Sequence, residues 1–203
     1  MQMTGPPPPP RQTPDTALPR EHLAHSVFFA IFPQRDDAKR IAAQSARLGE
    51  QHALKAKMTG MHRLHVTLHH FGRFAAVPPE LLQAALSAAA TVAPPSFDVV
   101  FDEALRFEKS KAFVLCGHEG TSELAAFRQR LSEALAKARF ACEPSFTPHM
   151  TLAYTSSNMK AHPIAPIRWT ADSFALVDSH VGKRVYEVLG RWSAAPDPSA
   201  LLV

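Results

Sequence analysis

Two copies of one tetrapeptide, His-x-Thr-Leu, restrict the folds that this chain of 203 residues can adopt. The first copy is His65-Val66-Thr67-Leu68, and the second is His149-Met150-Thr151-Leu152. Because successive side chains of a strand point to opposite faces, each strand presents its histidine and threonine on one side and its apolar residues on the other. The repeat predicts two strands, one from each half of the chain, that meet beside a single cleft.

The same alternation extends past both motifs. It places His69 on the cleft face with His65, so we expect His69 to contact a substrate, and it places His70 on the core side. In the second copy it places Ala153 on the cleft face.

The remaining elements follow from apolar periodicity and from breaks at proline and glycine. Besides the motif strands, we predict strands at 26–32, 97–107, 112–116, 167–177 and 185–192, and helices at about 38–48, 78–92 and 122–139. This order favours two related α+β halves over a regular alternation of strands and helices.

Composition predicts the domain boundaries and the cellular compartment. Residues 1–25 are rich in proline and poor in aliphatic side chains, so we expect a disordered tail, one domain at 26–195 and a short tail at 196–203. No run reaches the roughly 20 apolar residues of a membrane span. Cys116 and Cys142 are typical of unpaired thiols in a reducing compartment, and we expect a cytoplasmic protein without membrane contact.

Charge and side-chain chemistry favour work on phosphate esters. The net charge of +4 is compatible with an acidic partner such as RNA. Histidine accepts a proton in one step and donates one in another near neutral pH, and threonine hydroxyls donate to phosphate oxygens. We therefore expect catalysis by the two histidines with no metal and no cofactor.

Longer stretches around both motifs resemble one known family. Arg63 to His69, followed by Phe71-Gly72, and Phe146 to Leu152 are similar to the two-histidine phosphoesterases, and within them to the RNA 2′,3′-cyclic phosphodiesterases, also called 2′-5′ RNA ligases or LigT-like proteins. The stretches 27–33, 174–179 and 186–192 fit the same pattern, so the resemblance covers about residues 26–193.

The resemblance implies a bilobal α+β fold, with two pseudo-symmetric halves, antiparallel sheets flanked by helices and a central cleft. It also implies hydrolysis of RNA 2′,3′-cyclic phosphate ends to 2′-phosphomonoesters, and in some relatives 2′-5′ ligation. Carried over to this chain, His65 and His149 are the catalytic pair, and Thr67 and Thr151 bind the phosphate. We assign water activation to His149 and leaving-group protonation to His65, although the sequence does not distinguish the two roles.

One position departs from the family pattern. Relatives often carry an arginine two residues after the second motif's leucine, where this chain has Tyr154. Tyr154 and Arg63 are thus further candidates for substrate contact, and Phe28 is a candidate for stacking a base. A positive charge on the phosphate could also come from Arg73, Lys109, Lys111 or Arg168.

Two alternatives stay open at this point. One is a non-catalytic module that binds RNA ends, and the other is a phosphodiesterase of small cyclic nucleotides. In each case we expect a monomer, since the two halves complete the site within one chain.

Overall fold

The structure, a computed structural model, describes residues 23–117 and 120–194. In chain order its elements are β1 (His25–Ile31), α1 (Arg35–Gln51), the short 3-10 helix η2 (Met61–Arg63), β2 (Val66–Phe74), α2 (Pro79–Ala89), β3 (Phe97–Arg106), β4 (Ala112–Cys116), α3 (Ser122–Lys137), β5 (His149–Tyr154), β6 (His162–Ala171), β7 (Ser173–His180) and β8 (Val185–Ser193).

All eight of these strands form one antiparallel sheet in the order β6-β3-β4-β5-β2-β1-β7-β8. The two motif strands, β5 and β2, are its central pair, and Val66 opposite Met150 joins them. Each half of the sheet therefore consists of four strands, and the motifs lie where the halves meet. The predicted α+β fold with two related antiparallel halves is confirmed.

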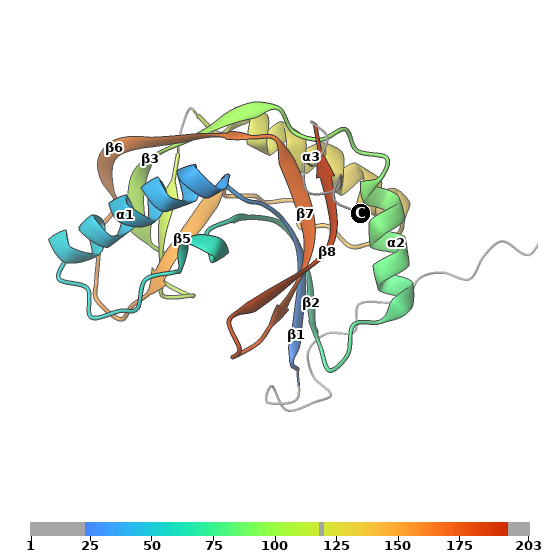
Figure 1. Cartoon of the computed structure of the whole chain (residues 1–203), viewed down its shortest axis with the longest axis horizontal. Helices are drawn as coiled ribbons and strands as arrows, with labels where there is room; N and C mark the ends of the chain where they lie inside the picture. Colours follow the sequence, from blue (N-terminus) through green and yellow to red (C-terminus); the bar gives the residue numbers. More distant parts are fainter. Residues whose placement is uncertain (1–22, 118–119, 195–203) are drawn as a thin grey trace, which may run out of the picture.

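The two faces of the sheet differ in what covers them. The main core contains Val27, Phe29 and Leu176 from the sheet together with apolar side chains from α1, α2 and α3. Two smaller clusters on the other face, one around Phe28 and Val177 and one around Ala112, Val114 and Cys116, draw only on strands and their flanking residues. The apolar side chains of the α-helices thus pack on one face, and the clusters on the face that carries both motifs come from strands and their flanking residues. Figure 1 shows α1 toward β6 and β3 and α2 toward β8.

Local sequence signals place the helices. Asp36 and Asp37 lie in the first turn of α1, where carboxylates favour the positive end of the helix dipole. Pro79 begins α2 at a position whose N–H would have no helical partner. Lys137 lies in the last turn of α3, where a cation suits the negative end.

One predicted strand is wrong. The stretch 167–177 is not a single strand, because the chain leaves β6 at Ala171 and starts β7 at Ser173, and these strands lie in opposite halves of the sheet. The residue between them, Asp172, accepts a hydrogen bond from Gln34 and so is tied to the start of α1. No glycine or proline marks this crossing, and for that reason the apolar pattern alone merges the two strands.

The described structure starts three residues before the predicted domain boundary at residue 26. Leu23 is already buried, and His25 starts β1. The predictions for the proline-rich tail and for the C-terminal tail otherwise fall on residues 1–22 and 195–203, outside the described structure.

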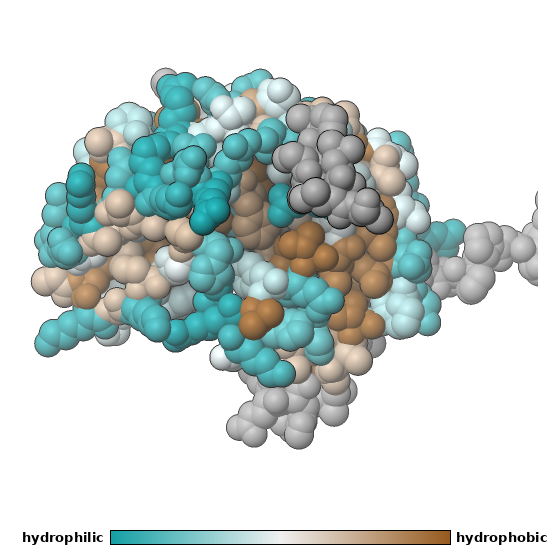
Figure 2. Space-filling view, viewed as in Figure 1, coloured by the Kyte–Doolittle hydropathy of each residue, from teal (hydrophilic) through white to brown (hydrophobic). Residues whose placement is uncertain are grey.

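Surface chemistry varies over the molecule. In Figure 2, hydrophilic side chains dominate the side that carries α1, and hydrophobic ones gather toward β8 and α2. No helix within the described residues is long and apolar enough to cross a membrane.

Candidate active site

A β-bulge follows the threonine of each motif. On β2, Thr67 pairs with Ala30 and His69 pairs with Phe29, so Leu68 is an extra residue. On β5, Thr151 pairs with Val114 and Ala153 pairs with Phe113, so Leu152 is an extra residue. Each bulge shifts the alternation by one residue, and the shift occurs at the same place in both halves.

The bulges correct two predictions about faces. His69 lies on the helix-covered face with Phe29 and is only 7% exposed, with its ring edge-to-face on Phe71. Ala153 lies in the main core as well. The prediction that these residues share the cleft face is therefore wrong, and so is the core position predicted for His70, which is exposed.

The catalytic candidates do come together at the central strand pair. Val66 lies opposite Met150, and the antiparallel register then sets His65 across from Thr151 and Thr67 across from His149. Electrostatic coupling between His65 and His149 agrees with their closeness. One histidine and one threonine from each half thus meet on the face without helices.

Both imidazoles are held in the same way. His65 Nδ1 lies 2.7 Å from the carbonyl oxygen of Arg63, and His149 Nδ1 lies 2.8 Å from that of Thr147. A carbonyl oxygen only accepts, so each Nδ1 carries the hydrogen and donates it. Nε2 of each ring is left for exchange of a proton with a ligand.

Aromatic rings surround His65. Phe28 stacks on its imidazole with ring centroids 5.1 Å apart, and Phe32 and Tyr186 each lie at 5.6 Å. Burial among these rings, with smaller contributions from the charges of His149 and Arg63, lowers the pKa of His65 to about 4. His65 is therefore a neutral imidazole at neutral pH.

Phe28 lies beneath this histidine, not at the cleft surface. It is 6% exposed, and one face of its ring is covered by His65. The structure thus offers Phe28 as a support for the imidazole and gives no room for the predicted stacking of a base on that face.

His149 has a more open setting. It is partly exposed, and its closest aromatic neighbour is Phe107 at the end of β3, edge-to-face at 4.9 Å. The two motif histidines are thus alike in backbone anchoring and different in their surroundings.

Arg63 supplies a cation beside the motifs. Its guanidinium lies 5.2 Å from the centroid of the Tyr186 ring and hydrogen-bonds to that residue. With Tyr154 and Arg184 it lines a cavity of about 550 Å³. Tyr154, which stands where relatives often carry an arginine, is 68% exposed and lines this cavity. Arg63 and Arg184 line the same cavity and bring positive charge to it.

The other cations named from the sequence lie elsewhere. Arg168 pairs with Asp98 at 3.2 Å on the β6-β3 side, and Arg73 lies opposite Ser26 toward the far end of β2. Lys109 and Lys111 are exposed at the turn between β3 and β4.

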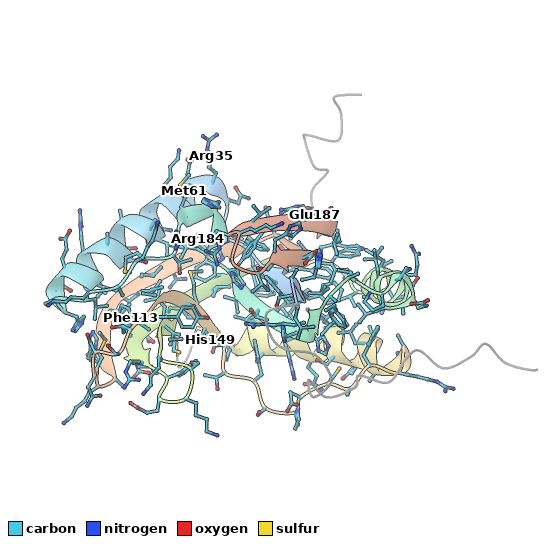
Figure 3. The ribbon with its side chains drawn as sticks, turned by 90° about the horizontal axis from the view of Figure 1, so that it is seen from below. Arg35, Met61, Phe113, His149, Arg184 and Glu187 are labelled. Atoms are coloured by element: carbon cyan, nitrogen blue, oxygen red, sulfur yellow. The ribbon has the colours of Figure 1, made fainter. Side chains whose placement is uncertain are left out.

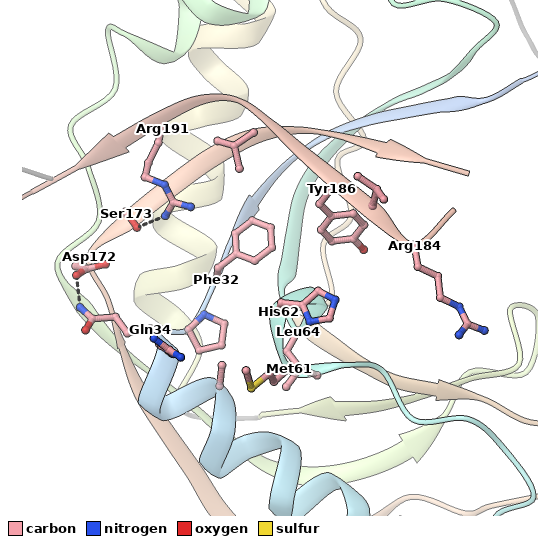
Figure 4. Close-up of a pocket in the computed structure, with 15 residues that line it drawn as sticks. Phe32, Gln34, Met61, His62, Leu64, Asp172, Ser173, Arg184, Tyr186 and Arg191 are labelled. Atoms are coloured by element: carbon pink, nitrogen blue, oxygen red, sulfur yellow. Dashed lines mark hydrogen bonds between the residues drawn. The ribbon is translucent and has the colours of Figure 1, made fainter. Parts of the chain in front are cut away.

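A second cavity, of about 660 Å³, adjoins the aromatic wall around His65. Phe32 and Tyr186 line it, together with Met61, His62 and Arg184 (Figure 4). Its lining combines apolar side chains with three arginines, Arg35, Arg184 and Arg191, as suits a nucleoside attached to a phosphate.

Several of these residues were not expected from the sequence. Arg184 has a positive φ of 59° in the turn between β7 and β8, and it lines both cavities. Tyr186 belongs to a stretch that fits the family pattern, but only the pairing of β8 with β7 brings it to His65.

Metal-binding potential lies outside the cleft. Within the described residues, one group of three histidine, cysteine or acidic side chains lies close enough to share an ion. It consists of His25, Asp178 and His180.

Comparison with known proteins agrees with the fold. An E. coli LigT structure complexed with 3′-AMP is 24% identical and matches with a TM-score of 0.68 over 83% of this chain and 97% of that chain. A structure described as a phosphoesterase matches at 23% identity, with a TM-score of 0.69 over 83% of this chain and 98% of the other. The protein TT0787 of Thermus thermophilus is 22% identical, with a TM-score of 0.61 over 83% of this chain and 97% of that chain.

No curated protein matches the sequence. The family model described as the 2′-5′ RNA ligase superfamily matches residues 33–183, a range that contains both motifs and the helices and strands between them. This chain belongs to the 2′-5′ RNA ligase superfamily.

Proposed function

We propose that the protein hydrolyses RNA 2′,3′-cyclic phosphate ends to 2′-phosphomonoesters by acid-base catalysis with His65 and His149. The observation that carries the proposal is the matched anchoring of the two imidazoles, each donating Nδ1–H to a backbone carbonyl two residues earlier. Family membership and the fold shared with LigT support the same class of reaction.

The surroundings of His65 favour it as the base. Its pKa of about 4 leaves Nε2 unprotonated at neutral pH, so it can take a proton from water. The water oxygen then bonds to phosphorus and the bond to O3′ breaks. His149 donates its Nε2 proton to O3′, which reverses the roles that we assigned from the sequence.

The threonines and Arg63 hold the phosphate in this scheme. Thr67 and Thr151, each across from the other motif's histidine, donate hydroxyl hydrogens to the non-bridging oxygens as their charge grows. Arg63 and Arg184 provide the positive charge that the family arginine provides in relatives. The 3′-AMP bound to E. coli LigT supports a ribose phosphate as the ligand.

Ligation uses the same step. When the 5′-hydroxyl of an RNA end replaces water as the nucleophile, breaking the bond to O3′ leaves a 2′-5′ linkage.

Turnover of a cyclic-phosphate RNA in EDTA tests the proposal. His65→Ala and His149→Ala should each lose about 10²–10⁴-fold in rate. His52→Ala is the matched control, because His52 lies at the end of α1 against His162, with Nε2 atoms 3.0 Å apart, and lines neither cavity of the site. Binding of the RNA without turnover would favour a binding module, and turnover of mononucleotides alone would favour a small-nucleotide enzyme.

A further inference from the structure

Three neighbouring strands bring two imidazoles and two carboxyl groups together on the face of the sheet opposite the motifs. His25 at the start of β1 pairs with His180 at the end of β7, and Asp178 lies two residues before His180 on the same side of that strand. Glu187 of β8 lies directly opposite Asp178. Tyr186, its neighbour along β8, contacts His65 on the other face.

Asp178 is at the centre of this group. Its Oδ2 lies 2.5 Å from His25 Nδ1 and 3.6 Å from His180 Nε2, and that same Nε2 lies 3.3 Å from Glu187 Oε2. Donor atoms of His25, Asp178 and His180 all lie within 4.8 Å of one another.

A second observation points to a cation. The Asp178 side chain is only 4% exposed, and its Oδ1 is buried with no hydrogen-bond partner among the described residues. Leaving a carboxylate oxygen buried and unpaired is costly, and a cation bound by the same carboxylate reduces that cost by compensating its charge.

The spacing suits a tetrahedral ion. Ligand bonds of about 2.1 Å in a tetrahedral zinc site put neighbouring donor atoms roughly 3.4 Å apart. The two contacts of His180 already have this separation, whereas His25 and Asp178 must move apart by about 1 Å from their direct hydrogen bond. His180 and His25 are about one quarter exposed, so an ion can reach them from solvent.

We propose that His25, Asp178 and His180 bind a divalent transition-metal ion of the zinc class, with Glu187 as the fourth ligand. Two imidazoles favour zinc over magnesium or calcium, which prefer oxygen ligands. The ion would tie β1, β7 and β8 together at the end of the sheet. In Figure 3, Glu187 lies well apart from His149, so this site is separate from the cleft.

Titration of the full-length protein with Zn²⁺ alone tests this proposal, after removal of metal with a chelator. Competition with a chromophoric chelator should give one tight ion per chain, and X-ray absorption should show nitrogen and oxygen ligands at about 2.0–2.2 Å. Zn²⁺ should also raise the Tm, because it binds only the folded state.

Asp178→Asn and His180→Ala should weaken zinc binding at least tenfold. Glu187→Gln, at a 60% exposed position, tests the site without risk to the core. His52→Ala is the matched control, because it removes a histidine from another close pair, His52 and His162, that has no carboxylate. The double variant His65→Ala, His149→Ala tests whether zinc binds in the cleft instead. Tight binding should survive in both controls.

Tight binding that persists in Asp178→Asn, His180→Ala and Glu187→Gln would overturn the proposal. Loss of binding in the cleft double variant alone, or no tight binding by the intact protein, would do so as well.

Discussion

The Phe28 ring is stacked on the His65 imidazole, with centroids 5.1 Å apart and planes at 22°. The contact joins β1 to the residue that precedes β2, and it excludes water from one side of the candidate base. With Phe32 and Tyr186 it explains why the pKa of His65 lies near 4, since burial disfavours the imidazolium ion.

Phe32→Ala should raise the pKa of His65 toward 6.5. Phe32 is only half-buried and lines the larger cavity, so its removal admits water to the imidazole with less loss of core than removal of Phe28. Titration of the His65 ring protons by NMR measures the change in pKa. The acidic limb of the pH–rate profile should move to higher pH by the same amount. An unchanged pKa would mean that the aromatic wall is not its cause.

His69→Phe should make the stability of the fold less dependent on pH. The pKa of His69 is lowered to about 4 by burial and by Arg128, whereas the unfolded chain titrates near 6.5. Between these values the unfolded state binds a proton and the folded state does not, so stability falls as the pH drops. We expect the free energy of unfolding, measured with urea, to fall between pH 7 and pH 4 by about 3 kcal/mol less in the variant than in the wild type.

The same variant should keep its turnover of cyclic-phosphate RNA, since His69 lies on the helix-covered face. A loss comparable to that of His65→Ala would instead place His69 at the cleft.

His65 and His69 show which side-chain positions can be predicted from the sequence and which cannot. Strand alternation predicts that each motif's histidine and threonine share one face, because the register is regular up to each threonine. It fails from the second residue after each threonine, at His69, His70 and Ala153, because a bulge depends on the pairing with the neighbouring strand, β1 or β4, and leaves no local signal. Tyr186 and Arg184 were missed for the same reason, since long-range pairing alone brings β8 to the cleft.

Arg63→Gln should raise the KM for a cyclic-phosphate substrate more than it lowers kcat. Its guanidinium lies beside the motifs and contributes charge to the ground-state phosphate as well as to the transition state. Steady-state kinetics separate the two constants. A fall in kcat with no change in KM would assign Arg63 to the transition state alone.

Tyr154→Arg should lower KM, because it adds a cation at an exposed position beside the same cavity. Tyr154→Gln is the matched neutral control, and equal gains in both variants would show that relief of bulk, not charge, is responsible.

Thr67→Val and Thr151→Val should each reduce kcat by about 10²–10³-fold, because each removes one donor to the phosphate oxygens while keeping the size of the side chain. The pKa of His65 should stay near 4 in Thr67→Val, and a large change would show that the effect acts through the histidine.

Product analysis in H₂¹⁸O shows which bond to phosphorus breaks and whether both histidines are needed. An RNA ending in a 2′,3′-cyclic phosphate is incubated with the protein and EDTA, and phosphorus NMR identifies the product. Attack of water on phosphorus with loss of O3′ predicts a single 2′-phosphomonoester with one ¹⁸O, formed about 10²–10⁴-fold more slowly by His65→Ala and by His149→Ala than by the wild type. A 3′-phosphate product, or a rate that survives in either variant, would contradict the two-histidine account.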